Sequence, residues 1–216
     1  MTTVMIPDLP FALEPDGSPP CEYRLTGGGL VLRAQPTTDL FIDPAGHVGD
    51  PPSAGRLTGV PPEGDFSLSA RATIDFGSKF DAGVLLVYVD DLRWAKLCFE
   101  YSPQHTPTAV TVVTKGTSDD CNSFEVKGNA LSLRITRTGR AWALHASHDR
   151  DWWHLLRYFA LEGPARVGFL AQSPAGKGCT ATFSEIRFRR DIPADLRDGS
   201  LSKNNPLNRP QATQFR

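Results

Sequence analysis

The sequence predicts an all-β protein built as an antiparallel sandwich, and three observations support that class. Apolar and polar residues alternate with a period of two from Phe66 to Phe76 and again from Trp94 to Tyr101, as expected for half-buried strands. Further short apolar or alternating runs follow at regular spacing as far as Arg189, with turn residues between them. No segment has a convincing amphipathic helix pattern. This combination favours a sandwich or barrel over any helical class.

The chain is long enough for one large all-β domain with a sizeable core. Its 216 residues are 40% hydrophobic and 22% charged, which excludes wholesale disorder. We expect an extended, proline-rich lead-in over residues 1–22, a sandwich domain over residues 23–190 and a polar tail over residues 191–216. The tail suggests contact with a neighbouring subunit, and hence a homo-oligomer.

Charge and hydropathy exclude several classes of partner. The formal net charge is −1, so no basic surplus exists to neutralise phosphates and non-specific nucleic-acid binding is not expected. The N-terminus has neither a basic n-region nor an apolar h-region, and no apolar run is long enough to cross a bilayer. We therefore expect a cytoplasmic protein without membrane contact.

The cysteines Cys21, Cys98, Cys121 and Cys179 are widely spaced and form no CxxC motif. In a reducing compartment they are expected to be free thiols. The alternative is two disulfides, for which sequence cannot choose among three pairings. Neither the cysteines nor His145, His148 and His154 have the spacing of a metal site, so no metal and no cofactor is predicted.

The order of elements follows from the pattern. Residues 21–34 predict two strands joined at the Gly27–Gly29 turn, and residues 35–62 predict a long irregular excursion that covers one edge of the sandwich. Val84–Val89 and Trp94–Tyr101 predict a hairpin that turns at Asp90 and Asp91. The later strands are expected at residues 107–115, 123–127, 131–136, 141–147, 152–159, 166–172 and 179–189, with a polar turn at residues 118–122.

Several short motifs occur in a fixed order along these elements. They are Thr38–Phe41; Ala82-Gly83 followed by Trp94-x-Lys96-x-x-x-Glu100-Tyr101; Val112–Gly116 with Ser118-Asp119; Ser147-x-Asp149-x-x-Trp152; and Val167–Phe169 with Gln172–Pro174. From about Leu25 to Phe188 the set resembles the DUF1349 family, also called regulation-of-enolase-like proteins. The resemblance implies a concanavalin A-like jelly roll of two curved antiparallel sheets, but it implies no particular reaction. Arg150 stands where that family usually has glycine, and the tail after Asp191 has no counterpart in it.

The candidate ligand site lies on the strand of residues 94–101. Trp94, Lys96 and Glu100 share one face of this strand, where an indole can stack on a sugar ring and the charged groups can bind hydroxyls or a carboxylate. Lys115 and Asp119, together with Asp120, are expected to extend this surface. The alternative is a structural Lys96–Glu100 salt bridge beside a tryptophan packed under the long 35–62 segment.

These features support three functional hypotheses. The first is a non-catalytic, carbohydrate-binding-like protein that takes a saccharide or another small polar ligand. The second is a cytoplasmic regulatory protein with a protein partner, as the family resemblance suggests. The third is a glycoside hydrolase or lyase. It requires a second carboxyl beside Glu100, from Asp119 or Asp120, because the paired-carboxylate motif is absent and Ser102 follows two residues after Glu100. No catalytic residue is assigned.

Overall fold

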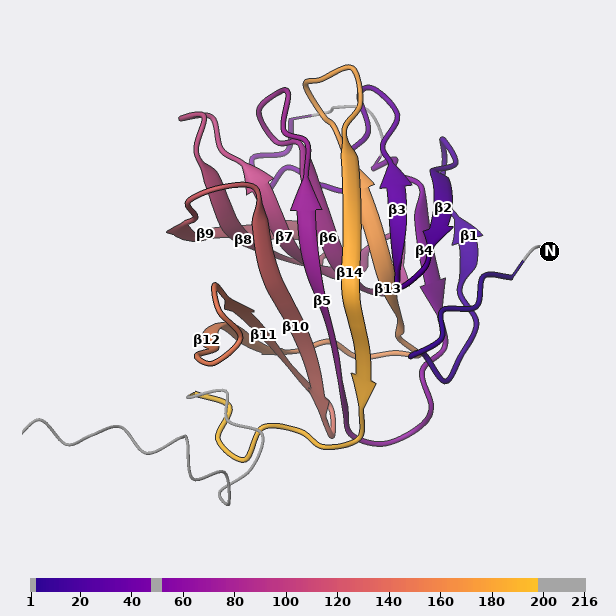
Figure 1. Ribbon diagram of the computed structural model, residues 1–216. Coiled ribbons are helices and arrows are strands. Elements are labelled where there is room, and N and C mark those ends of the chain that lie inside the picture. The colour runs from indigo at the N-terminus through magenta and orange to yellow at the C-terminus, as the bar shows by residue number, and fades with distance from the viewer. Residues whose placement is uncertain (1–2, 48–51, 198–216) are drawn as a thin grey trace, which may run out of the picture.

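The computed structural model describes residues 3–47 and 52–197 and shows two antiparallel sheets packed face to face (Figure 1). The first sheet contains, in spatial order, β1 (Glu14–Asp16), β4 (Arg56–Gly59), β13 (Arg166–Gln172), β6 (Ala82–Asp90), β7 (Arg93–Tyr101), β8 (Pro107–Lys115) and β9 (Thr117–Glu125). The second contains β12 (His154–Ala160), β11 (Ala141–Ser147), β10 (Ala130–Thr138), β5 (Phe66–Ile74), β14 (Thr180–Arg189), β3 (Gly29–Arg33) and β2 (Glu22–Thr26). The predicted all-β sandwich is confirmed.

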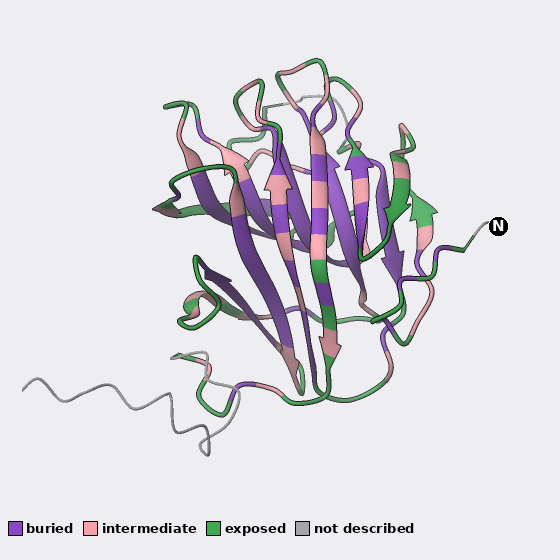
Figure 2. Cartoon of the chain, in the orientation of Figure 1, coloured by how far each residue is buried: buried purple, intermediate pink, exposed green. Residues whose placement is uncertain are grey.

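The core lies between the inner faces of the two sheets, and the predicted alternation accounts for it. On β5, Phe66, Leu68, Ala72 and Ile74 are buried, whereas the outward Arg71 is partly exposed. The burial pattern in Figure 2 shows the same striping along β14. Because successive side chains of a strand point to opposite faces, each sheet contributes one apolar face to the core and keeps one outer face.

The lead-in is part of the sandwich. Residues 14–16 form β1, which pairs with β4 at the edge of the first sheet. Val4, Ile6, Leu9 and Leu13 are buried in the main core. Prolines and glycines around residues 51–62 hid β4 in the sequence pattern, and a three-residue edge strand such as β1 is too short to give a periodic signal.

The predicted turn at residues 118–122 is wrong. The turn lies at Gly116, where φ is +83°, and β9 runs without interruption from Thr117 to Glu125. Most of β9 is exposed because it is the last strand of its sheet. Polar residues are therefore tolerated along it, as on many edge strands.

The four cysteines are free thiols. The described part of the tail contacts the second sheet, because Ser67 Oγ donates a 3.0 Å hydrogen bond to the Asp191 carbonyl oxygen and His145 Nε2 lies 2.6 Å from the Leu196 carbonyl oxygen. The predicted subunit contact of the tail rests mainly on residues 198–216, which lie outside the described residues. No helix in the described part of the chain is both long and apolar enough to cross a membrane.

Candidate functional site

The outer face of the first sheet carries the predicted triplet. Trp94, Lys96 and Glu100 alternate along β7, and the register places Val112 of β8 and Asp120 of β9 in one row with Lys96. Asp119 pairs with Val113 in the neighbouring row, so its side chain is assigned to the other side of the sheet. The triplet is therefore brought together, with Asp120 rather than Asp119 as the acidic neighbour.

A covering loop, residues 35–47 and 52–55, lies across this face. Its residues Leu40, Phe41, Ile42 and Ala54 pack on Trp94 and on the apolar outward side chains of β6, β8 and β13. We call this assembly the outer cluster. The loop is fixed to β9 by two 2.9 Å hydrogen bonds, from the Ser118 amide to the Ile42 carbonyl and from the Ile42 amide to Ser118 Oγ.

Trp94 is completely buried in the outer cluster, with 0% of its surface exposed. Its Nε1 is also buried and has no hydrogen-bond partner among the described residues. A stacking platform must present a ring face to the ligand. Trp94 presents no ring face to solvent in this structure. Its position therefore matches the structural alternative, in which the tryptophan packs under the long 35–62 segment.

Lys96 is also buried, with 2% of its surface exposed. Its partners differ from Glu100, the partner that the structural alternative predicted. Its Nζ lies 3.4 Å from Asp39 Oδ1 and 3.0 Å from Gln172 Oε1. Burial opposes ionisation of Lys96, but the negative charges around it, with Asp39 first, raise its pKa above the ordinary value. The ammonium therefore ties the covering loop, through Asp39, to β7 and β13.

Glu100 lies further along β7, at the partly exposed end of the row. Burial raises the pKa of its carboxyl to about 7; Lys96 lowers it, and Asp39 and Asp120 raise it further. Asp39 is already bound to Lys96. Asp120 is level with Lys96 and two strands away, so Glu100 and Asp120 are not a directly opposed pair.

The raised pKa predicts a specific pH dependence of stability. The folded state holds the Glu100 proton more tightly than the unfolded state between the ordinary value of 4.5 and about 7. The contribution of this group to the free energy of unfolding therefore falls as the pH rises through that range. We expect Glu100→Gln to match the wild type at pH 4 and to exceed it by about 2 kcal/mol at pH 8, a figure reduced for partial exposure.

Urea unfolding at the two pH values measures this difference, with the exposed Glu125→Gln as control. Burial lowers the pKa of His145 to about 4. This residue is present in the wild type and in both variants, so its contribution to the pH dependence of stability cancels. An equal effect of Glu100→Gln at pH 4 and pH 8 would contradict the assigned ionisation.

The other two predicted residues lie elsewhere. Lys115 is exposed at the end of β8, where it lines a hollow at one end of the sandwich together with Asp91 and Arg140. The Asp119 carboxylate forms a 2.7 Å ion pair with Arg157 of β12, which joins the edges of the two sheets. Neither residue extends the face of Trp94, Lys96 and Glu100.

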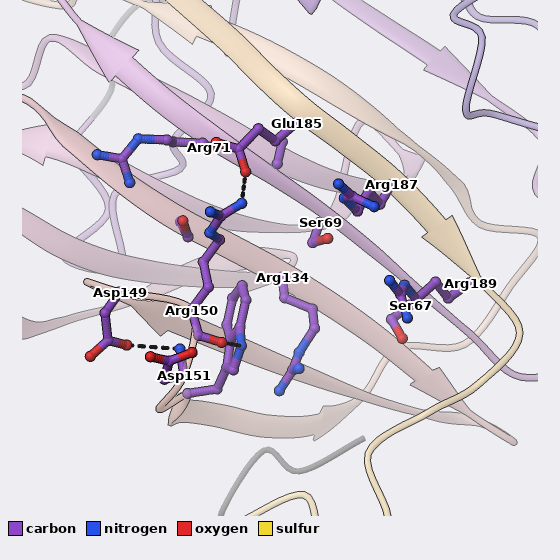
Figure 3. Close-up of a pocket in the computed structure, with 13 residues that line it drawn as sticks. Ser67, Ser69, Arg71, Arg134, Asp149, Arg150, Asp151, Glu185, Arg187 and Arg189 are labelled. Atoms are coloured by element: carbon purple, nitrogen blue, oxygen red, sulfur yellow. Dashed lines mark hydrogen bonds and ion pairs between the residues drawn. The ribbon is translucent and has the colours of Figure 1, made fainter. Parts of the chain in front are cut away.

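A second polar site occupies the outer face of the other sheet, and sequence reasoning missed it. A pocket of about 410 Å³ lies over β5, β10 and β14 beside the β11–β12 turn (Figure 3). We call it the arginine pocket, because five arginines line it: Arg71, Arg134, Arg150, Arg187 and Arg189. Ser67, Ser69 and Ser132 add hydroxyl groups, and Trp153 adds a partly exposed ring.

The β11–β12 turn forms one wall of this pocket. Asp149 Oδ1 accepts hydrogen bonds from the amides of Asp151 and Trp152 at 2.9 and 3.1 Å, and these bonds lower the pKa of Asp149. Arg150 has a φ of +72°, a left-handed conformation that explains why the related family usually has glycine there. The Ser147–Trp152 motif therefore has a structural role in this turn.

A β-bulge forms the opposite wall. The register of β14 against β5 shifts between Ser184 and Arg187. Regular alternation from Ser184 would direct Arg187 and Arg189 into the core, but the extra residue turns them to the outer face and leaves Ile186 buried inside. In the sequence this bulge is marked by a change of apolar phase between Phe183 and Ile186, a signal that was not followed to the arginines.

Comparison with known proteins identifies the class. The sequence matches DUF1349, described as a protein family of unknown function, over residues 18–191, and the chain belongs to that family. It is 28% identical to Regulation of enolase protein 1 of Saccharomyces cerevisiae over 175 residues, which cover 79% of this chain and 86% of that protein.

Two solved structures show the same architecture. A functionally unknown protein from Saccharomyces cerevisiae has a TM-score of 0.72 and 24% identity, over 82% of this chain and 96% of that one. The GH43 protein BlXynB of Bacillus licheniformis has a TM-score of 0.60 and 14% identity, over 75% of this chain but only 33% of that one. The sandwich thus resembles the jelly-roll folds seen in glycoside hydrolase structures, and the second likeness covers only part of the larger protein.

Proposed function

We propose that this protein is a non-catalytic binding module that takes a saccharide in the arginine pocket. The observation that carries the proposal is the combination of an open pocket of about 410 Å³ with hydroxyl, guanidinium and indole groups on one sheet face. Saccharides present hydroxyls to hydrogen-bonding groups and CH faces to aromatic rings. The hydroxyls and most of the arginines stand on strands, and the Asp149 hydrogen bonds hold the turn that carries Trp153, so these groups are positioned before the ligand binds.

The covered face is a weaker candidate for both binding and hydrolysis. The covering loop buries Trp94, and Lys96 already has Asp39 and Gln172 as partners. Glycoside hydrolysis uses two carboxyls that flank the bond to be cleaved. Glu100 and Asp120 stand in different rows of the sheet, two strands apart, which does not favour that arrangement.

A glycan array of neutral and acidic saccharides tests the proposal. We expect the wild type to bind at least one class and Trp153→Ala to lose that binding, because Trp153 lines the pocket. Trp152→Ala is the matched control, since this neighbouring side chain is exposed and lies outside the pocket lining. Absence of wild-type binding across the array, or equal loss in both variants, would refute the assigned site.

A second candidate function is the regulation of another protein through direct binding. The yeast relative named Regulation of enolase protein 1 favours it. Size-exclusion chromatography of this protein mixed with purified enolase is the direct test. Co-elution as a stable complex supports the regulatory function, and separate elution at micromolar concentrations counts against it.

A further inference from the structure

The arginine pocket has an unbalanced charge. Its lining contains five arginines and three acids, Asp149, Asp151 and Glu185. This leaves a surplus of two positive charges in a chain whose formal net charge is −1. The surplus is therefore local to the pocket and does not reflect a generally basic surface.

Internal contacts account for two of the arginines. Arg150 forms an ion pair with Glu185 across the pocket, as the dashed line in Figure 3 shows. The Arg134 guanidinium lies over the ring of Trp153, at 4.3 Å from its centroid. The Asp149 carboxylate is held by the amides of its own turn. These contacts build the wall of the pocket. They involve two of its three acids, Asp149 and Glu185, and do not involve the Asp151 carboxylate.

The other three arginines, Arg71, Arg187 and Arg189, have no ion pair with any described residue. Arg187 stands opposite Ser69 and Arg189 opposite Ser67, while Arg71 is diagonal to Arg187 across the β5–β14 pair. Diagonal neighbours in a sheet are about 7–8 Å apart. This spacing joins the backbones, and Figure 3 shows the Arg71 side chain directed away from Arg187 and Arg189. An anion that draws the three long side chains together would offset the repulsion among their charges.

Ser132 gives an independent indication of a ligand. It stands opposite Arg71 on β10 and lines the pocket. The residue is only 1% exposed, and its Oγ is buried without a hydrogen-bond partner among the described residues. Buried hydroxyls in proteins normally have a partner, so the floor of the pocket offers an unused polar atom beside Arg71.

We propose that the saccharide bound here carries an oxyanion, a carboxylate or a sulfate, held by Arg71, Arg187 and Arg189. This inference rests on the proposed function and specifies its ligand class. Guanidinium groups bind carboxylates and sulfates through paired, charge-assisted hydrogen bonds, which are about twice as strong as neutral ones. A neutral saccharide of the same shape lacks that contact.

Isothermal titration with matched ligand pairs tests the inference. The probes are uronate oligosaccharides with their methyl-esterified forms, sulfated oligosaccharides with their desulfated forms, and inorganic phosphate. We expect an acidic probe to bind at least 10-fold more tightly than its neutral form, and Arg187→Gln to remove about 10-fold of that affinity. Arg187 is exposed, so the variant is expected to fold. Arg24→Gln, on exposed β2 of the same sheet and outside the pocket lining, is the matched control.

Each outcome distinguishes the two proposals. Equal binding of acidic and neutral forms, unchanged in Arg187→Gln, overturns the oxyanion inference and leaves saccharide binding intact. Binding of phosphate as tightly as the best acidic saccharide supports the anion site and overturns its assignment to saccharides. Binding of no probe by the wild type overturns both proposals.

Discussion

Trp94→Ala is expected to lower the free energy of unfolding by about 3–5 kcal/mol, the usual cost of truncating a large buried aromatic residue. The indole is fully buried in the outer cluster, where it contacts both the sheet and the covering loop. Its loss leaves a cavity between two layers that the hydrogen bonds to Ser118 still hold in place. Urea unfolding measures the loss.

Two further variants make this prediction specific. Trp94→Phe is expected to cost only about 1 kcal/mol, because it keeps most of the ring and removes an N–H that has no partner among the described residues. Trp152→Ala, at a side chain 53% exposed, should change stability by no more than about 0.5 kcal/mol. If Trp94→Ala is as stable as Trp152→Ala but loses saccharide binding, Trp94 belongs to the ligand site after all.

Asp39→Asn is expected to destabilise the protein by about 3 kcal/mol, since it leaves the buried Lys96 ammonium without its carboxylate partner. Removing the lysine instead, in Lys96→Met, should cost less stability. The Asp39 side chain is 38% exposed and water can solvate it in Lys96→Met, where methionine also fills the vacated space. The asymmetry follows from the different burial of the two partners.

A double-mutant cycle checks this prediction. Adding Lys96→Met to Asp39→Asn should recover part of the lost stability, because no unpaired buried charge then remains. Additive losses in the double variant would mean that the two side chains do not interact in solution.

The sequence was sufficient for the fold class because its signals are local. Alternation along residues 66–76 and 94–101 assigned each side chain to a face, and the ordered motifs gave the family. The same alternation correctly placed Trp94, Lys96 and Glu100 on one face of β7. The alternation could not predict that this face is buried. The covering loop that contacts it lies more than 50 residues earlier in the chain.

One error and one omission at the site have the same physical origin, a shift of register. Placing a turn at residues 118–122 hid the fact that Asp120, and not Asp119, faces outward on β9. The bulge after Ser184 changed the faces of Arg187 and Arg189. A shift by one residue exchanges the two faces of a strand. The shift in β14 was marked in the sequence only by the change of apolar phase between Phe183 and Ile186.

The central claim is that ligands bind the open arginine pocket of the second sheet and not the covered face of the first. Amide chemical-shift mapping by NMR during titration with the tightest-binding saccharide of the panel tests it most directly. We predict shifts concentrated on β5, β10, β14 and the β11–β12 turn. Shifts centred on β7 and on residues 38–42 of the covering loop, with the arginine pocket unchanged, would contradict the claim.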